Sequence, residues 1–409
     1  MNKQFSKSRN QFSNIAPSSR FTNLFWVAVM MAPALSYAVP DPSPDPAATT
    51  VYLRTTCNIA NVDGAGEGTI ENCFESMFSL RTWIYARINP QKLLVDIGPG
   101  TFTNFACSSK PAGDLSFRGA GIDKTIIGGV TNSACSNAKW AFSDLTVRAV
   151  SNAVQWLDAG SSSWNNVVLE STTASSWYDA GGSSNSATGN LSDQPCAPGE
   201  QGTHRFTSVR FISSAATNTG EGGSIGFLNR CGDNWLWGSE IIFTPAPGGT
   251  GSAIMSRGAA SRIHLYGSNV RAEASPAATS GAVTAFYVRD GAEVHSHGVG
   301  IDVIVNTGMT GTALDAASGG SIHANASSYA VSSSTGTTYR RIVNNGGHVH
   351  APYFWEHIPA QTFESVTGAD TATVISGTSD GQPHLVIYSK TCLAGSPGWY
   401  DTTDKICRQ

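Results

Sequence analysis

The sequence predicts an all-β solenoid, in which short coils of β-strand stack on one another. Two observations support this fold class: a histidine-containing motif that recurs at a nearly fixed interval, and many short β-branched segments that end at glycine. Charged residues make up only 13% of the 409-residue chain, whereas 43 residues are glycine, which suits a body with many tight turns. The main alternative is a β-sandwich, which a fixed period disfavours.

The recurring motif consists of two small residues, a variable residue and an apolar β-branched residue, followed by a histidine. Its copies are separated by 27 to 31 residues, so each copy represents one structural unit. A unit this short cannot bury a core alone and must stack on its neighbours. The four copies, of which the first is the loosest, end at His264, His295, His323 and His350.

The N-terminal segment, residues 1–38, has the features of a signal peptide. Four basic residues precede an apolar run over residues 24–35, and a Ser-Tyr-Ala sequence ends at Ala38. We expect cleavage after Ala38, with an uncleaved membrane anchor as the alternative. The next residues, 39–50, are rich in proline and predict an extended linker.

The charge balance restricts the classes of partner. No acidic residue precedes Ala38, so cleavage changes the formal net charge from −4 to about −8. An acidic mature chain disfavours nucleic acid and anionic membranes as partners. No other apolar segment reaches transmembrane length, so we expect no membrane span after signal cleavage.

All eight cysteines lie after the predicted cleavage site. An even number of cysteines behind an export signal predicts disulfides and an oxidising compartment. Eight cysteines allow many pairings, and we favour pairing of sequence neighbours because each bond then closes one local loop. The expected pairs are Cys57–Cys73, Cys107–Cys135, Cys196–Cys231 and Cys392–Cys407.

The rest of the chain divides into a cap, a body and a second cap. In residues 51–90, apolar residues recur at helical spacing, which predicts an amphipathic helix that covers the open end of a stacked sheet. Its apolar positions are Ile70, Cys73, Phe74, Met77, Ile84 and Ile88. Short strands separated by glycine fill residues 91–360, and residues 361–409 are expected to form a C-terminal cap stapled by the last cysteine pair.

Three glycine-containing segments, residues 97–102, 115–121 and 125–129, resemble the opening coils of right-handed parallel β-helix proteins of the pectin lyase-like superfamily. The resemblance implies a right-handed parallel β-helix solenoid with an N-terminal capping helix, in an exported bacterial protein. It also implies an extracellular polysaccharide as partner. The paired-aspartate blocks, Gln/Asp/Arg blocks and calcium-binding Asp clusters of the familiar enzymes are not recognisable here, so no catalytic residue is carried over.

The four motif histidines are expected to form a ladder on one outer face, because side chains alternate along a strand and adjacent strands lie about 4.8 Å apart. Three interpretations are open: a divalent metal site, a catalytic base, or identical side chains that only stack. A metal site would hold zinc, copper or calcium. Its candidate ligands are His295, His297, Glu293 and His323.

The segment that follows Cys231 offers a candidate carbohydrate site. Trp235 and Trp237 lie close in sequence to Asp233. Exposed tryptophan rings stack on sugars, and a carboxylate accepts hydrogen bonds from sugar hydroxyls. The alternative is that strand alternation buries one of the two tryptophans in the core.

Three arginines follow inward-pointing valines in similar strand contexts. We expect Arg148, Arg210 and Arg271 to form a broken stripe on the outer face. Arg210 and Arg271 are the candidates for contacts with carboxylates of an acidic polysaccharide. The alternative is that they are solvated or paired with nearby acidic residues.

Together these patterns predict a secreted or periplasmic protein, with attachment to the cell surface also open, that interacts with an extracellular polysaccharide. Catalysis stays open, and an enzyme of this kind would be a polysaccharide lyase or a glycoside hydrolase. The alternative is a non-catalytic structural, adhesive or surface protein, which the missing catalytic blocks and the acidic charge balance favour.

Overall fold

The computed structural model of the protein places most of residues 49–357. The described residues are 49–57, 68–86, 92–107, 114–133, 135, 138–180, 201–216, 223–325, 327–333, 338–351, 354–357, 384–386, 399–401 and 406–408. They belong to the second of two compact units, Pro42–Gln409. The predicted signal peptide and most of the predicted C-terminal cap lie outside the described residues.

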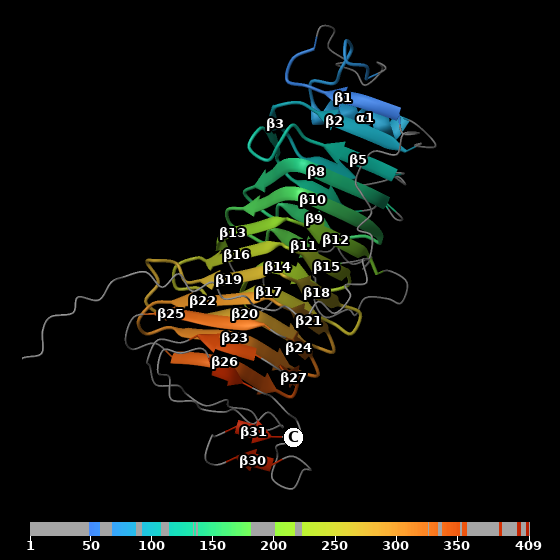
Figure 1. The fold of residues 1–409 in the computed structure, drawn as a ribbon. Coiled ribbons are helices and arrows are strands. Elements are labelled where there is room, and N and C mark those ends of the chain that lie inside the picture. Colours follow the sequence, from blue (N-terminus) through green and yellow to red (C-terminus); the bar gives the residue numbers. More distant parts are fainter. Residues whose placement is uncertain are drawn as a thin grey trace, which may run out of the picture. The chain divides into compact units, whose positions relative to one another are not determined.

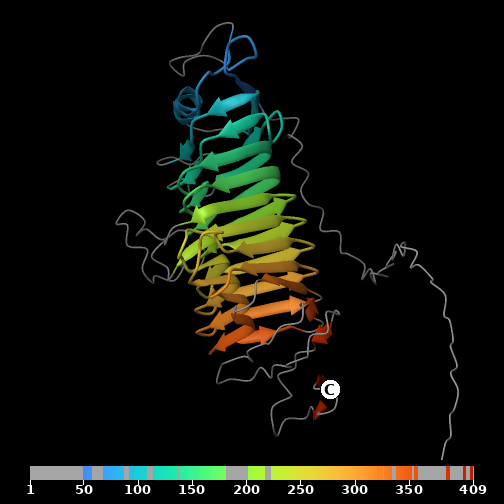
Figure 2. The same cartoon turned by 90° about the vertical axis from the view of Figure 1, so that its left-hand side faces the viewer.

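The body consists of three ladders of parallel strands, and successive strands of the chain visit the ladders in turn (Figures 1 and 2). Two ladders belong to one 20-stranded sheet and the third forms a 9-stranded sheet. One passage through all three ladders is called a coil below. This all-β arrangement of stacked parallel sheets is compatible with a parallel β-helix, as the repeat predicts.

The first ladder begins with the first strand of the chain and carries the motif histidines. Its strands are β1 (Thr49–Leu53), β2 (Leu93–Ile97), β5 (Asp114–Arg118), β8 (Ala138–Ala149), β10 (Gly160–Ser171), β12 (Thr203–Thr207), β15 (Asp233–Trp237), β18 (Arg262–Tyr266), β21 (Glu293–His297), β24 (Ser321–Asn325) and β27 (His348–His350).

The second ladder shares the two long strands β8 and β10 with the first. Its other strands are β3 (Gly100–Phe102), β6 (Thr125–Ile127), β13 (Arg210–Ala216), β16 (Glu240–Pro245), β19 (Asn269–Glu273), β22 (Gly300–Val305), β25 (Ser328–Ser333) and β28 (Phe354–His357).

The third ladder is the 9-stranded sheet. Its strands are β4 (Phe105–Cys107), β7 (Val130–Asn132), β9 (Val154–Trp156), β11 (Trp177–Asp179), β14 (Ser224–Asn229), β17 (Gly251–Arg257), β20 (Ala282–Arg289), β23 (Thr310–Ala317) and β26 (Thr338–Asn345). Among the C-terminal residues, β29 (His384–Val386) pairs antiparallel with β28, and β30 (Trp399–Asp401) pairs antiparallel with β31 (Ile406–Arg408).

The glycines of the histidine motif have a structural cause. The first small residue of the motif is Gly291, Gly319 or Gly346 in three copies, each with φ near +80° (+80°, +80° and +79°), a left-handed conformation that favours glycine. The second is small because the preceding coil lies against it, and a Cβ added to Gly320 would clash with the Val288 carbonyl oxygen. The motif therefore encodes the turn from the third ladder into the first. The histidine points outward because it lies next to the inward-pointing β-branched residue of the strand.

A single α-helix is described in the N-terminal segment, α1 (Met77–Ala86). It begins later than the apolar spacing predicts. Phe74 instead pairs with Leu53 at the end of β1, and the Ser76 hydroxyl accepts a hydrogen bond from the Ser79 backbone N–H at 3.1 Å, which caps the helix. The helix buries Met77, Leu80, Trp83 and Ile84 in the main core. Ile70, expected on its apolar face, is exposed, and Ile88 lies outside the described residues.

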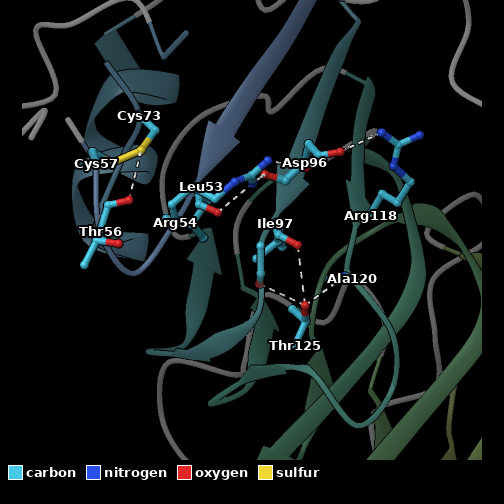
Figure 3. A network of polar contacts seen from close by, with 11 residues as sticks. Leu53, Arg54, Thr56, Cys57, Cys73, Asp96, Ile97, Arg118, Ala120 and Thr125 are labelled. Atoms are coloured by element: carbon cyan, nitrogen blue, oxygen red, sulfur yellow. Dashed lines mark hydrogen bonds and ion pairs between the residues drawn. A yellow bond between two sulfur atoms is a disulfide. The ribbon is translucent and has the colours of Figure 1, made fainter. Parts of the chain in front are cut away.

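The first coils are joined by a charged network, and a disulfide links Cys57 to Cys73 in the segment between β1 and α1 (Figure 3). Arg54 and Arg118 reach the Asp96 carboxylate from two sides, at 2.7 Å and 2.6 Å. Burial raises the pKa of Asp96, but the hydrogen bonds from Arg118 and Arg54 outweigh this effect and hold the pKa below its usual range. One carboxylate thus connects three successive strands of the first ladder: the end of β1, β2 and β5.

Two of the expected disulfides are present, Cys57–Cys73 and Cys107–Cys135, with Cα atoms 5.6 Å and 5.9 Å apart. Cys231 is also disulfide-bonded, whereas its expected partner Cys196 and the first cysteine of the last pair, Cys392, lie outside the described residues. Disulfides of this kind indicate folding in an oxidising compartment. Among the described residues, no helix is long and apolar enough to cross a membrane.

The interior of the N-terminal coils is a stack of aromatic rings. Phe117, Phe142 and Trp164 occupy the same position in successive strands of the first ladder and lie parallel, with centroids 4.8 Å and 4.1 Å apart. Phe206 continues the stack in β12. Towards the C-terminus the same position is occupied by Leu236, Leu265, Ser296 and Ala324.

Candidate functional site

The outer face of β15, β18, β21 and β24 carries two columns of stacked rings, here called the outer ring plate. In the first column His264 stacks on Trp235 with centroids 3.9 Å apart, His295 on His264 at 5.0 Å and His323 on His295 at 4.7 Å. These positions are aligned because the four strands pair in parallel, each with the next, with no register shift between them. His264, His295 and His323 therefore form the expected ladder, and His350 is in register with His323, although its ring is tilted by 45° with centroids 6.0 Å apart.

The second column runs beside the first and contains Trp237, Tyr266 and His297. Tyr266 and His297 are parallel within 5° with centroids 5.1 Å apart, and Trp237 lies 6.1 Å from Tyr266. Both Trp235 and Trp237 are half-exposed on the outer face, and the buried members of β15 are Asn234 and Leu236. The alternative interpretation, in which one of the two tryptophans is buried in the core, is wrong, because residues two apart in a strand share a face.

The stacking determines which parts of the rings can meet a ligand. Each imidazole between two neighbours has both faces covered, so only ring edges with their nitrogen atoms face solvent. The exception is the N-terminal border of the plate, where β15 is next to β12. The residues of β12 in register with Trp235 and Trp237 are Arg205 and Thr207, and among the described residues no ring stacks on that side of either indole. The border is thus the one place where the plate has tryptophan faces without an aromatic neighbour.

Asp233 lies at the same border. His264 Nε2 is 3.3 Å from Asp233 Oδ1. Burial raises the pKa of Asp233, but hydrogen bonds from the side chains of His264 and Trp235 outweigh it and lower the pKa. The carboxylate therefore stays ionised at neutral pH and acts as a hydrogen-bond acceptor beside the indoles.

Burial and close packing favour the neutral form of three imidazoles of the plate, because the pKa values of His295, His297 and His323 are lowered. Burial, followed by the charges of His295, His348 and His350, lowers the pKa of His323 to about 4. The pKa of His295 is also lowered, by burial and then by His264, although Glu293 opposes this shift. A proton on one ring is repelled by protons on its neighbours, so the stack favours the uncharged form.

The expected metal ligands share this face but do not form a coordination shell. His295 Nε2 lies 3.6 Å from Glu293 Oε2, and His323 and His297 stack in separate columns. Among the described residues, no group of three or more His, Cys, Asp or Glu side chains lies close enough to hold a metal ion. The zinc, copper or calcium site stays a sequence-based prediction, and the observed contact between the rings is stacking.

The three arginines do not form one stripe. Arg148 and Arg271 share a column of the second ladder, whereas Arg210 lies in the neighbouring column, because it begins its strand. Each forms an ion pair with a glutamate, at 2.7 Å for Arg148–Glu170, 2.8 Å for Arg210–Glu240 and 2.9 Å for Arg271–Glu273. The local pairing that the sequence left open is therefore what the structure contains.

A buried polar group lies inside the coils at the level of β10 to β15. His204 Nδ1 is 2.8 Å from the Ser162 hydroxyl, and His204 Nε2 is 3.5 Å from Asp179 Oδ2. The order Ser–His–Asp matches a nucleophilic triad in connectivity, but His204 and Asp179 are fully buried and Ser162 is 5% exposed. Burial lowers the pKa of His204 to about 3, so it is a neutral, hydrogen-bonded core residue out of reach of a substrate.

The third ladder carries a pocket that sequence reasoning missed. It has a volume of about 260 Å³ and opens on the outer face of β14, β17, β20, β23 and β26. Ser252, Thr284 and Thr312 lie in register along it. The signal in the sequence was a hydroxyl residue at the same offset in three successive coils, which becomes visible only once the register of the strands is known.

Comparison of the sequence with models of known protein families and with curated proteins finds no match.

Proposed function

We propose that the chain is an exported, right-handed parallel β-helix protein of the pectin lyase-like kind that binds an extracellular polysaccharide non-covalently. In this proposal residues 1–38 are a signal peptide, α1 caps the first coil and residues 361–409 form a C-terminal cap. The three parallel ladders and the disulfides support the fold and the oxidising compartment. The binding site is the N-terminal border of the outer ring plate.

The observation that carries the proposal is the position of Trp235 and Trp237. Their ring planes are parallel within 18° and their centroids lie 5.8 Å apart, so the two indoles form one broad apolar step at the border. The strands towards the N-terminus present small polar residues in the column of Trp237, namely Thr207 and Asn165. A sugar ring placed above that step stacks on an indole face, which is the usual mode of contact between tryptophan and carbohydrate.

Polar groups around the step match sugar hydroxyls. The ionised Asp233 carboxylate accepts hydrogen bonds, and the edges of the neighbouring imidazoles donate or accept them. The described arginines of the second ladder are paired with glutamates, and at the step itself the positive charge of Arg205, which is in register with Trp235, is matched by the ionised Asp233 carboxylate. A neutral polysaccharide is therefore the favoured partner, and no catalytic residue is assigned.

A second candidate function is that of a rigid structural or adhesive protein. The mutual stacking of His264, His295 and His323 favours it, because rings that cover each other stabilise the coil and leave no face for a ligand. The two candidates differ at the border only, where the indoles either bind sugar or merely end the stack.

Binding of the secreted protein to a panel of neutral and acidic polysaccharides tests the proposal, with reducing ends and unsaturated products scored separately. We expect binding to at least one neutral polymer, and the Trp235→Ala/Trp237→Ala variant to bind at least about tenfold more weakly, because a stacked aromatic side chain contributes on the order of 1 kcal/mol or more.

The matched control is Phe78→Ala, which removes an exposed aromatic ring from α1 and should leave binding unchanged. Absence of binding to every polymer, or unchanged binding by the double tryptophan variant, contradicts the proposal. If the double tryptophan variant still releases reducing ends or unsaturated products, an enzymatic site lies elsewhere in the protein.

A further inference from the structure

The pocket on the third ladder arises from a bend in its strands. Ala285 and Phe286 of β20 are consecutive, yet both pack in the main core, as do Ala313 and Leu314 of β23. Consecutive residues of a flat strand point to opposite faces, so each strand must bend at this position. A bend towards the interior in neighbouring coils leaves a hollow on the outer face, and that hollow is the 260 Å³ pocket.

The floor of the pocket is a column of hydroxyl groups. Ser252, Thr284 and Thr312 are aligned in β17, β20 and β23, one coil apart. Their hydroxyls make no hydrogen bond within the described part of the chain, unlike the buried Ser175 and Ser213 hydroxyls, which bond to backbone carbonyls. A hydroxyl both donates and accepts, so the column offers repeated two-way contacts to a ligand with several hydroxyls of its own.

The wall beside the hydroxyl column is partly apolar. Met255 and Tyr287 are in register with each other in adjacent coils and both line the pocket. They belong to an apolar cluster separate from the main core, with Tyr287 partly buried against it. The pocket therefore combines an apolar side with a polar floor, which suits a ligand that has an apolar ring face and polar edges.

The charges at the end of the pocket compensate one another. Arg289, which lines the pocket, lies 3.1 Å from Asp290 Oδ2, and Arg257 lies 3.0 Å from the same atom. Asp315 supplies a further negative charge on the lining. Among the described side chains at this end of the pocket, two cations and two carboxylates leave no net charge, so the site does not favour an ionised ligand.

From this geometry we propose a second ligand site: the pocket binds one uncharged, hydroxyl-rich ring of the size of a single pyranose or cyclic polyol. Its volume is below the roughly 300–1,000 Å³ of pockets that enclose drug-sized ligands, which restricts it to a small molecule or to one unit of a chain. The site lies on a different ladder from Trp235 and Trp237, and it does not depend on the function proposed for them.

Titration calorimetry and saturation-transfer NMR with the whole mature chain test this site, using glucose, galactose, mannose and inositol, with glucuronate as the charged comparison. We expect at least one neutral ligand to bind with a 1:1 stoichiometry. Thr284→Val/Thr312→Val keeps the shape of both side chains but removes two hydroxyls, and it should weaken binding at least about tenfold.

The matched control is Thr131→Val, at an outward position of β7 in the same sheet but away from the pocket, and it should bind as the wild type does. The circular dichroism spectrum and melting curve of each variant establish that it is folded. The Trp235→Ala/Trp237→Ala variant should also retain small-ligand binding, which separates this site from the polysaccharide site.

No binding by any neutral ligand, tighter binding of glucuronate than of every neutral ligand, or unchanged binding by Thr284→Val/Thr312→Val overturns the inference. Loss of small-ligand binding in the double tryptophan variant also overturns it, because the ligand would then occupy the border of the outer ring plate.

Discussion

The N-terminal and C-terminal coils of the body place their aromatic rings on opposite sides of the same ladder. From β5 to β12 the rings are inside, where Phe142 and Trp164 lie 4.1 Å apart in the core. From β15 to β24 the interior positions carry no aromatic ring, and the rings lie outside, where His264 and His295 are 5.0 Å apart. The reversal occurs between β12 and β15, at the border that carries Trp235 and Trp237.

The same stacking geometry has different consequences on the two sides. Inside, a ring is removed from water completely and its burial stabilises the coil by the full hydrophobic contribution. Outside, a ring is only half covered, its edge stays wet, and an imidazole can exchange protons with solvent. The inner stack is therefore a source of stability, whereas the outer ring plate is a surface whose charge depends on pH.

The largest expected effect is that of removing a ring from the inner stack. Trp164 is 1% exposed and its indole N–H donates to the Ser162 hydroxyl at 2.7 Å. Trp164→Ala should destabilise the protein by about 3–5 kcal/mol, whereas Trp235→Ala on the outer plate should cost about 0.5–1.5 kcal/mol. Urea denaturation followed by circular dichroism, with the disulfides intact, measures both. Equal losses would mean that position inside or outside the coil does not govern the energetics.

A smaller effect is expected from acid. An imidazole whose pKa is lowered by folding is favoured in its neutral form, so the folded state binds fewer protons than the unfolded state. The free energy of unfolding therefore includes the full contribution of the neutral imidazoles above pH about 6.5, the ordinary pKa of histidine. This contribution is lost as the pH falls towards 4, the folded value of His323.

Thermal unfolding between pH 7 and pH 4 measures this contribution. The melting temperature of the wild type should fall more steeply than that of His295→Gln/His323→Gln, which cannot titrate at these two positions. Because carboxylates such as Asp96 and Asp233 are present in both proteins, the difference between the two curves isolates the imidazoles. Parallel curves would contradict the stacking effect on the pKa values.

Much of the architecture followed from the sequence because the turn chemistry repeats. Gly291, Gly319 and Gly346 mark left-handed turns at one place in each coil, and the alternation of β-strands then puts the next histidine outside. Two disulfides were also predictable, since neighbouring cysteines close loops of 16 and 28 residues.

The site was harder to predict because it depends on which residues meet across coils. The similar strand contexts of the arginines predicted one stripe, but the register places Arg210 beside Glu240 and in a column separate from that of Arg271. The pocket requires a bend at Ala285 and Phe286, and no local sequence pattern predicts this bend. The Ser162–His204–Asp179 group joins three strands separated by loops of unequal length, so its members have no fixed spacing.

The most direct test of the polysaccharide site observes the indole N–H groups in the presence of ligand. The chain has ten tryptophans, and TROSY spectra of protein labelled with ¹⁵N resolve their indole signals, which Trp235→Phe and Trp237→Phe assign. Adding a soluble oligosaccharide of the bound neutral polymer should shift the signals of Trp235 and Trp237. It should leave those of the buried Trp140, Trp156 and Trp164 unchanged. Shifts confined to other tryptophans, or none at saturating ligand, would contradict the assignment of the border as the polysaccharide site.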